Sequence, residues 1–119
     1  MRDLVVKVTC GADDPERCNQ AFTVAASAAA AGANVSLWLT GEAAWFALPG
    51  RAEEFDLPHA AALADLLTAV AGAGTVTVCT QCATRRGITE GDLREGVRIA
   101  GAATFAEEIL REGVQALVY

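Results

Sequence analysis

One stretch of the sequence combines residue types and spacing that favour chemistry. Five residues from Thr75 to Cys79, rich in β-branched side chains, predict a short buried strand, and the chain then runs through Thr-Gln to Cys82. In open α/β sheets, ligands and reacting groups gather outside the carboxyl ends of the strands, where the next helical turn presents unpaired backbone N–H groups. We therefore expect both thiols of this Cys-x-x-Cys pattern to lie in such a crevice.

Cys79 has two interpretations. As a nucleophile it must be a thiolate, and a helix N-terminus with nearby cations is the environment that lowers the pKa of a cysteine. Arg85 and Arg86 follow closely enough to supply the positive charge. As a purely structural residue, Cys79 would be a small hydrophobic side chain at the end of a strand.

The other candidate ligands carry weaker patterns. Cys10 follows the first predicted strand, so it either projects into the same crevice as Cys79 or only occupies a turn, and we favour the turn. Cys18 falls on the apolar stripe of a predicted helix and is expected in the core. A zinc site of four cysteines would need an unusual Cys-x7-Cys spacing, so no metal is predicted. His59 has no sequence neighbour suited to a triad and is expected at a helix start.

Composition limits the class of protein. The 119 residues suffice for one domain, 1–119, with its own core, and no apolar run reaches the ~18 uncharged residues of a membrane span. Nine basic and fifteen acidic residues give a net charge of -6, which disfavours binding to nucleic acid. The start of the chain has no secretory pattern, so we expect a soluble, cytoplasmic protein whose four cysteines do not form a disulfide framework.

The apolar periodicity predicts strands that alternate with helices. A parallel arrangement with right-handed crossovers follows from this alternation, giving a three-layer sandwich around a mostly parallel five-stranded sheet of the Rossmann or flavodoxin-like type. Thr104-x-x-Glu107 matches a capping box for the last helix. The expected strands are 4–8, 34–40, 75–79, 97–100 and 115–119, and the expected helices are 15–31, 42–48, one that opens at Pro58, and one that starts near Thr104.

Several short segments, spread over nearly the whole chain, resemble the DsrE/DsrF-like proteins, a family that includes small sulfur-relay subunits of sulfur oxidation and of tRNA thiolation. Their order and spacing carry the resemblance more than any single segment does. The segments are Val5 to Gly11, Ala31-Gly-Ala-Asn-Val35, Val78-Cys79, Arg85-Arg86-Gly87-Ile88, Asp92-Leu93, and Gly101 to Phe105.

The resemblance implies a role for Cys79. In the sulfur-relay members the acceptor cysteine ends a central strand and a glycine follows eight residues later, a spacing that Cys79 and Gly87 reproduce. Together with the position at a strand end, this spacing makes us favour a chemical role for Cys79. The resemblance further implies a homotrimer or homohexamer that works with sulfur-donor and sulfur-acceptor proteins, without a cofactor.

Cys82 lies outside the relay pattern, and three roles remain open for it: a resolving thiol that forms a disulfide with Cys79, a second sulfur acceptor, or a packing residue. The sequence thus predicts an intracellular sulfur carrier or sulfurtransferase that accepts a persulfide sulfur on Cys79. The alternatives are an oligomeric module that binds a small molecule or protein without catalysis, and a Cys-x-x-Cys dithiol redox protein.

Overall fold

The computed structural model describes residues 2–119 and places them around a five-stranded sheet. All of its strand pairs are parallel, and the strand order is β4-β3-β2-β1-β5. This confirms the predicted α/β class and sharpens the expected mostly parallel sheet to a fully parallel one. The strands are β1 (Asp3–Val8), β2 (Asn34–Leu39), β3 (Thr75–Cys79), β4 (Val97–Ala100) and β5 (Gln115–Val118).

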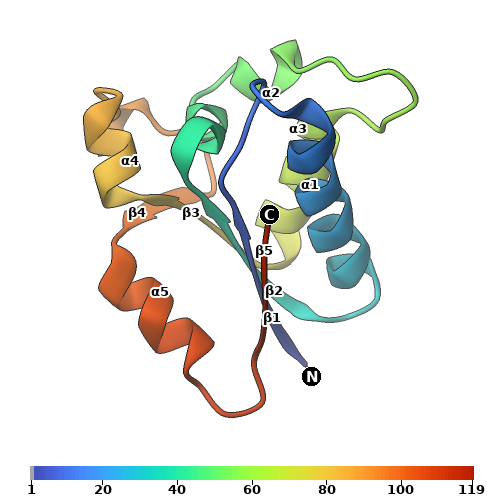
Figure 1. Ribbon diagram of the computed structural model, residues 1–119, viewed down its shortest axis with the longest axis vertical. Helices are drawn as coiled ribbons and strands as arrows, with labels where there is room; N and C mark the ends of the chain where they lie inside the picture. The colour runs from blue at the N-terminus through green and yellow to red at the C-terminus, as the bar shows by residue number, and fades with distance from the viewer. Residues whose placement is uncertain (1) are drawn as a thin grey trace.

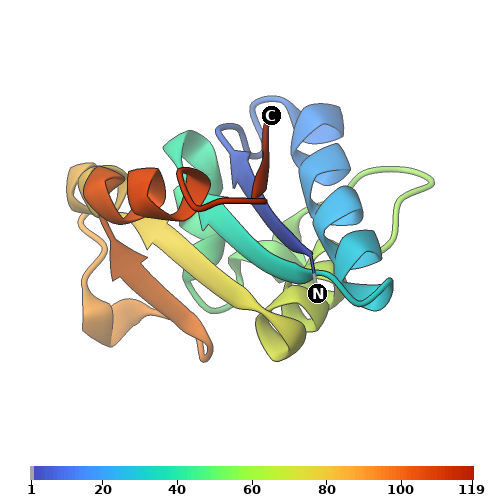
Figure 2. The same cartoon turned by 90° about the horizontal axis from the view of Figure 1, so that it is seen from below.

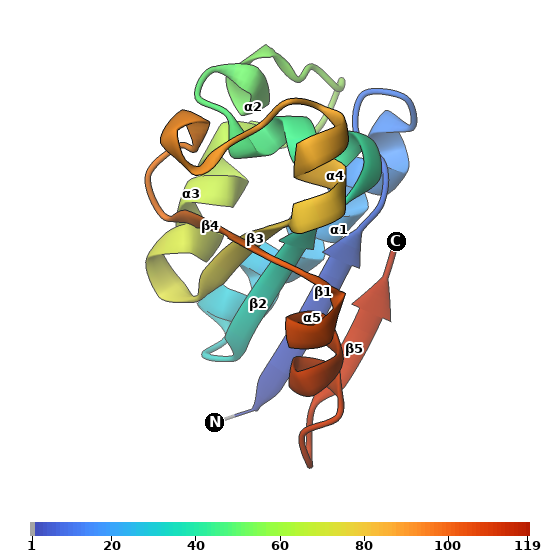
Figure 3. The same cartoon turned by 90° about the vertical axis from the view of Figure 1, so that its left-hand side faces the viewer.

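Helices occupy both faces of this sheet. Helices α1 and α3 pack side by side on one face, whereas α5 crosses the other face on its way from β4 to β5 (Figures 1 and 2). The short elements η1, α2, α4 and η2 gather mainly at the carboxyl ends of the strands (Figure 3). The helices are α1 (Pro15–Ala30), η1 (Gly41–Ala47), α2 (Arg51–Glu54), α3 (Leu63–Ala73), α4 (Thr80–Arg85), η2 (Glu90–Asp92) and α5 (Ala102–Ile109).

The main core lies between the sheet and the pair α1 and α3. Because side chains alternate along a strand, every second residue of β1, β2 and β3 points to this face. Val6 pairs with Leu37, and Leu37 with Val76, so that these apolar side chains form a continuous row across the sheet. Phe22 of α1 and Leu67 of α3 cover the row and are almost completely buried.

The opposite face is held by a buried carboxylate. Glu108 of α5 is only 6% exposed, and its Oε1 accepts hydrogen bonds from Ser36 Oγ (2.6 Å) and Trp38 Nε1 (3.0 Å). Its Oε2 accepts one from Arg98 Nη2 (2.8 Å), and Arg98 Nε also donates to Thr77 Oγ1 (2.8 Å). A single side chain therefore joins α5 to β2 and β4.

The edge strand β5 is the least covered part of the sheet. All four of its residues are exposed, including Leu117 and Val118, and Leu110 near the end of α5 is 81% exposed. Figure 3 shows β5 at the edge of the sheet, with α5 lying in front of the adjacent strand β1. No helix among residues 2–119 is both long and apolar enough to cross a membrane.

Two predicted helix starts are wrong. The helix expected at Pro58 begins only at Leu63, because His59 has a φ of +63°, a left-handed conformation that interrupts a helix. The last helix begins at Ala102 rather than at Thr104, since the chain turns at Gly101 directly after β4. A capping box is found at a different helix: Thr89 and Asp92 form it at the start of η2.

One further segment differs from its prediction. Residues 51–57 carry several charges and little apolar periodicity, a pattern that predicts an exposed loop, yet the first four of them form the single-turn helix α2. Ala52 anchors this turn in the core with 1% exposure, whereas Arg51, Glu53 and Glu54 remain exposed around it. One buried alanine therefore sets the conformation of a segment that is otherwise polar.

The Glu108 network generates a stability prediction. Burial alone would raise the pKa of Glu108, but hydrogen bonds from Ser36 and Trp38 and the charge of Arg98 outweigh burial and hold that pKa below its ordinary value. The stability that the carboxylate contributes is therefore present above a pH of about 4.3 and is lost as the pH falls through the lowered pKa. We expect Glu108→Gln to reduce the free energy of unfolding by about 1–3 kcal/mol at pH 7, measured by urea denaturation.

The matched control is Glu107→Gln, because Glu107 is an exposed neighbour on the same helix. It should change the free energy of unfolding by less than about 0.5 kcal/mol. Equal effects of the two variants would show that the Glu108 network does not hold α5 on the sheet.

Candidate functional site

Cys79 and Cys82 flank the first turn of α4. Cys79 is the last residue of β3 and the N-cap of α4, and Cys82 is the third residue of the helix. The side chains of an N-cap residue and of the third helical residue lie on the same side of a helix start, as in a capping box. Both cysteines are half-buried free thiols. The structure therefore places both predicted cysteines at the first turn of α4, at the carboxyl end of the sheet.

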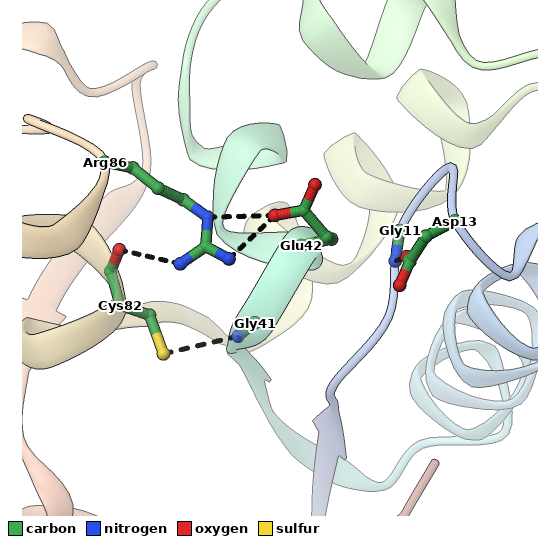
Figure 4. A network of polar contacts seen from close by, with 6 residues as sticks. All are labelled: Gly11, Asp13, Gly41, Glu42, Cys82 and Arg86. Carbon is green, nitrogen blue, oxygen red and sulfur yellow. Dashed lines mark hydrogen bonds and ion pairs between the residues drawn. The ribbon is translucent and has the colours of Figure 1, made fainter.

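Cys82 is held by the neighbouring strand end. The backbone N–H of Gly41, directly after β2 and Thr40, donates a hydrogen bond to Cys82 Sγ at 3.3 Å (Figure 4). Gly41 has a φ of +54°, and a Cβ atom at this position would lie 2.3 Å from the carbonyl oxygen of Thr9. Only glycine fits here, because it has no side chain to clash and tolerates the left-handed conformation. This close approach brings a hydrogen-bond donor to the sulfur of Cys82.

Arg86 joins α4 to η1. Its Nη2 and Nε donate to Glu42 Oε2 at 2.7 and 3.2 Å, and its Nη1 donates to the carbonyl oxygen of Cys82 at 3.1 Å (Figure 4). The side chain of Arg86 is 18% exposed. Its positive charge is therefore balanced by Glu42, and its contacts join the helix to η1.

Arg85 behaves differently from its neighbour. It lies in the last turn of α4 and is exposed, and it takes part in none of the ion pairs formed within residues 2–119. Within residues 2–119, Arg85 is thus an exposed cation beside the Cys-x-x-Cys segment that forms no ion pair.

Cys10 and Cys18 lie in the hydrophobic core. Cys10 is 5% exposed and Cys18 is fully buried, as predicted for Cys18 from its helical stripe. Burial, followed by the charge of Asp14, raises the pKa of Cys10, and burial together with the neighbouring Cys10 raises the pKa of Cys18 to about 12. Both thiols therefore stay protonated at neutral pH. Cys10 also lies apart from Cys79 in the sheet, because β2 separates β1, which leads to Cys10, from β3, which ends at Cys79.

The remaining candidates are the potential metal ligands and His59. Among residues 2–119, no three His, Cys, Asp or Glu side chains converge as a ligand set. His59 is exposed in the loop before α3, where it lines a shallow surface pocket with Glu16 and Asn19.

Sequence reasoning missed the residues contributed by η1. Gly41, Glu42 and Trp45 follow β2, which is the direct neighbour of β3, and all three surround the Cys82 side of the site. The sequence carries a signal, because Gly41-Glu42 directly follows the predicted strand 34–40 and so lies at the same edge of a parallel sheet as Cys79. The strand order was needed to make β2 and β3 neighbours.

Comparison with known proteins adds a family and several similar folds. The family model described as the DsrE/DsrF-like family matches residues 3–118. The solved structure of the ychN protein from E. coli is 19% identical over the full length of both chains, with a TM-score of 0.83. No curated protein matches the chain.

Two further solved structures are similar, and both are described as proteins of unknown function. MTH1491 from Methanobacterium thermoautotrophicum is 13% identical over the full length of both chains, with a TM-score of 0.71. BT1422 from Bacteroides thetaiotaomicron is 16% identical over 98% of this chain and 94% of its own, with a TM-score of 0.64. At these identities the similarity establishes the fold alone.

The geometry at Gly41 generates a second prediction. We expect Gly41→Ala to destabilise the protein by about 1–3 kcal/mol or more in thermal or urea unfolding, because the added Cβ meets the Thr9 carbonyl and the φ is strained. Gly113→Ala is the matched control: its φ is +81°, but nothing lies within 4 Å of the added Cβ. The control should lower the free energy of unfolding by clearly less than Gly41→Ala does. Equal losses in the two variants would argue against a tight contact between Gly41 and Thr9.

Proposed function

Because the chain belongs to the DsrE/DsrF-like family, we propose that it is an intracellular sulfur carrier or sulfurtransferase that takes up a persulfide sulfur on Cys79. The observation that carries this proposal is the position of Cys79, a half-buried free thiol that ends a central strand and forms the N-cap of the following helix. Cys10 and Cys18, in contrast, are buried and held protonated.

The proposed reaction needs no oxidant or cofactor. The thiolate of Cys79 attacks the outer sulfur of a donor persulfide R–S–SH, a new S–S bond forms to Cys79, and the donor S–S bond breaks with its electron pair leaving on R–S⁻. The product is Cys79–S–SH. An acceptor thiolate then attacks the outer sulfur in the same way and releases Cys79 as a thiolate, which restores the starting state.

Cys82 extends this proposal. Its sulfur is fixed by the Gly41 N–H, and its backbone carbonyl by Arg86, so its place beside Cys79 is set by tertiary contacts. In the proposed cycle Cys82 serves as the second acceptor of the sulfur, whereas a resolving role for Cys82 belongs to the second candidate function. The same arrangement supports the second candidate function, dithiol redox chemistry, because an N-cap cysteine and a cysteine at the third helical position are spaced to form a disulfide.

Sulfur loading is the direct test. The reduced protein is exposed to inorganic polysulfide, its intact mass is measured, and the cysteines are mapped by peptide analysis. We expect a gain of one sulfur atom on Cys79 in the wild type and in Cys82→Ser, and no gain in Cys79→Ser. Cys18→Ser serves as the matched control and should load normally, since Cys18 is fully buried.

Other results would assign a different role. A loss of two hydrogens with Cys79 joined to Cys82, and no retained sulfur, would favour dithiol redox chemistry. Unchanged loading of Cys79→Ser would contradict the assignment of the site. No reaction of any variant would favour a binding module without catalysis.

We also propose that the protein assembles as a homotrimer or homohexamer and exchanges sulfur with donor and acceptor proteins. Exposed apolar side chains at Leu110, Leu117 and Val118 support this assembly, because large exposed apolar residues of this kind often mark protein interfaces. Light scattering should give a molar mass of three or six times the 12.3 kDa of one chain. Val118→Glu should lower this mass toward that of a single chain. A wild-type monomer would contradict the proposed assembly.

A further inference from the structure

A small pocket adjoins the Cys82 side of the site. Its volume is about 260 Å³, and it lies between η1 and α2 at the carboxyl ends of β1 and β2. Its lining combines three aromatic side chains with three charged ones, namely Trp45, Phe46, Phe55, Glu42, Arg51 and Glu54. Phe46 and Phe55 meet edge to face with ring centres 5.8 Å apart, so part of the lining is a packed aromatic pair.

The charged residues of this pocket differ in whether they form ion pairs. Glu42 is engaged by Arg86. Arg51 lies over the ring of Trp45, 4.5 Å from its centre, and neither Arg51 nor Glu54 takes part in an ion pair within residues 2–119. The two residues are three positions apart on α2, a spacing that permits a mutual ion pair, yet they do not form one. The pocket lining therefore contains one cation, Arg51, and one anion, Glu54, that form no ion pair within residues 2–119.

A ligand that matches this lining is a small molecule that carries one negative and one positive charge. An α-amino-acid group does so, because its carboxylate fits the planar fork of Arg51 and its ammonium group fits the carboxylate of Glu54. We propose that the pocket binds the amino-acid head group of a low-molecular-weight thiol or persulfide. Free cysteine and γ-glutamyl peptides such as glutathione share this head group, and both are included in the test below.

The position of the pocket connects it to the thiols. Glu42 forms part of its wall, and the preceding residue, Gly41, donates its N–H to Cys82 Sγ. A ligand anchored by its head group would extend its sulfur past Gly41 toward the Cys-x-x-Cys segment. The transfer step rests on the proposed function: the outer sulfur of the bound persulfide passes to Cys79, and the amino-acid thiol leaves as its thiolate. Binding of the head group does not depend on that step.

Binding is tested with ligands that cannot react. Isothermal titration calorimetry of the wild type with S-methylcysteine should show saturable binding at one site. Arg51→Met and Glu54→Gln should each weaken this binding about tenfold or more, because each removes one charge-assisted contact. Glu53→Gln is the matched control, since Glu53 lies on the same helix but does not line the pocket, and its affinity should equal that of the wild type.

Ligands that lack one charge make the test sharper. Arg51→Met should not weaken the affinity for 2-(methylthio)ethylamine, which has no carboxylate, and Glu54→Gln should not weaken the affinity for N-acetyl-S-methylcysteine, which has no ammonium group, because each variant removes only a like charge. Tighter binding of S-methylglutathione than of S-methylcysteine would identify the γ-glutamyl peptide as the source of the head group, and the reverse order would identify free cysteine. Absence of saturable binding for both, or equal losses in Glu53→Gln, would overturn the proposal.

A kinetic comparison separates this inference from the proposed function. Inorganic polysulfide has no head group, so Arg51→Met should load Cys79 from polysulfide at the wild-type rate but should load more slowly from the cysteine or glutathione persulfide. Failure of polysulfide loading in the wild type and in every variant would contradict the sulfur-carrier proposal, whereas the calorimetric evidence for head-group binding would still stand. Equal loading rates of Arg51→Met and the wild type, from polysulfide and from the cysteine or glutathione persulfide alike, would show that the pocket takes no part in the reaction.

Discussion

The site depends on the close approach of two backbone segments at the carboxyl edge of the sheet. Gly41 leaves β2 with a left-handed φ and passes so close to the carbonyl of Thr9 that no side chain fits between them. This turn directs the Gly41 N–H to Cys82 Sγ and starts the η1 helix, which carries Glu42 and Trp45. One conformational constraint thus positions the second thiol, the ion-pair partner of Arg86, and the wall of the adjacent pocket.

The two faces of the sheet are stabilised by different interactions. On the face of α1 and α3, rows of Val and Leu side chains supply hydrophobic burial, the dominant favourable term in folding. On the other face, α5 buries a glutamate and packs Phe105 edge to face against Trp38, with ring centres 5.3 Å apart. A carboxylate with three donors has a defined geometry, so Glu108 fixes where α5 lies while leaving Leu110 and β5 uncovered.

The four cysteines show how environment separates residues of one type. Cys10 and Cys18 lie in the core, where burial raises the pKa of each thiol, and they behave as small apolar side chains. Cys79 and Cys82 lie half-exposed at the start of α4, where a donor and a nearby cation are available. The tertiary structure thus divides the thiols into an unreactive pair and an accessible pair.

The sequence by itself determined the α/β class and the place of Cys79. Strands such as Thr75–Cys79 and the Asp14-Pro15 helix start could be predicted because alternation and N-terminal proline act locally. The start of α3 could not, since alanine favours helix and no local pattern signals the left-handed φ of His59, which delays the helix to Leu63. Only the tertiary structure decided that Gly41 and Glu42 meet Cys82 and Arg86, because these contacts join residues more than forty positions apart and depend on the order of β2 and β3.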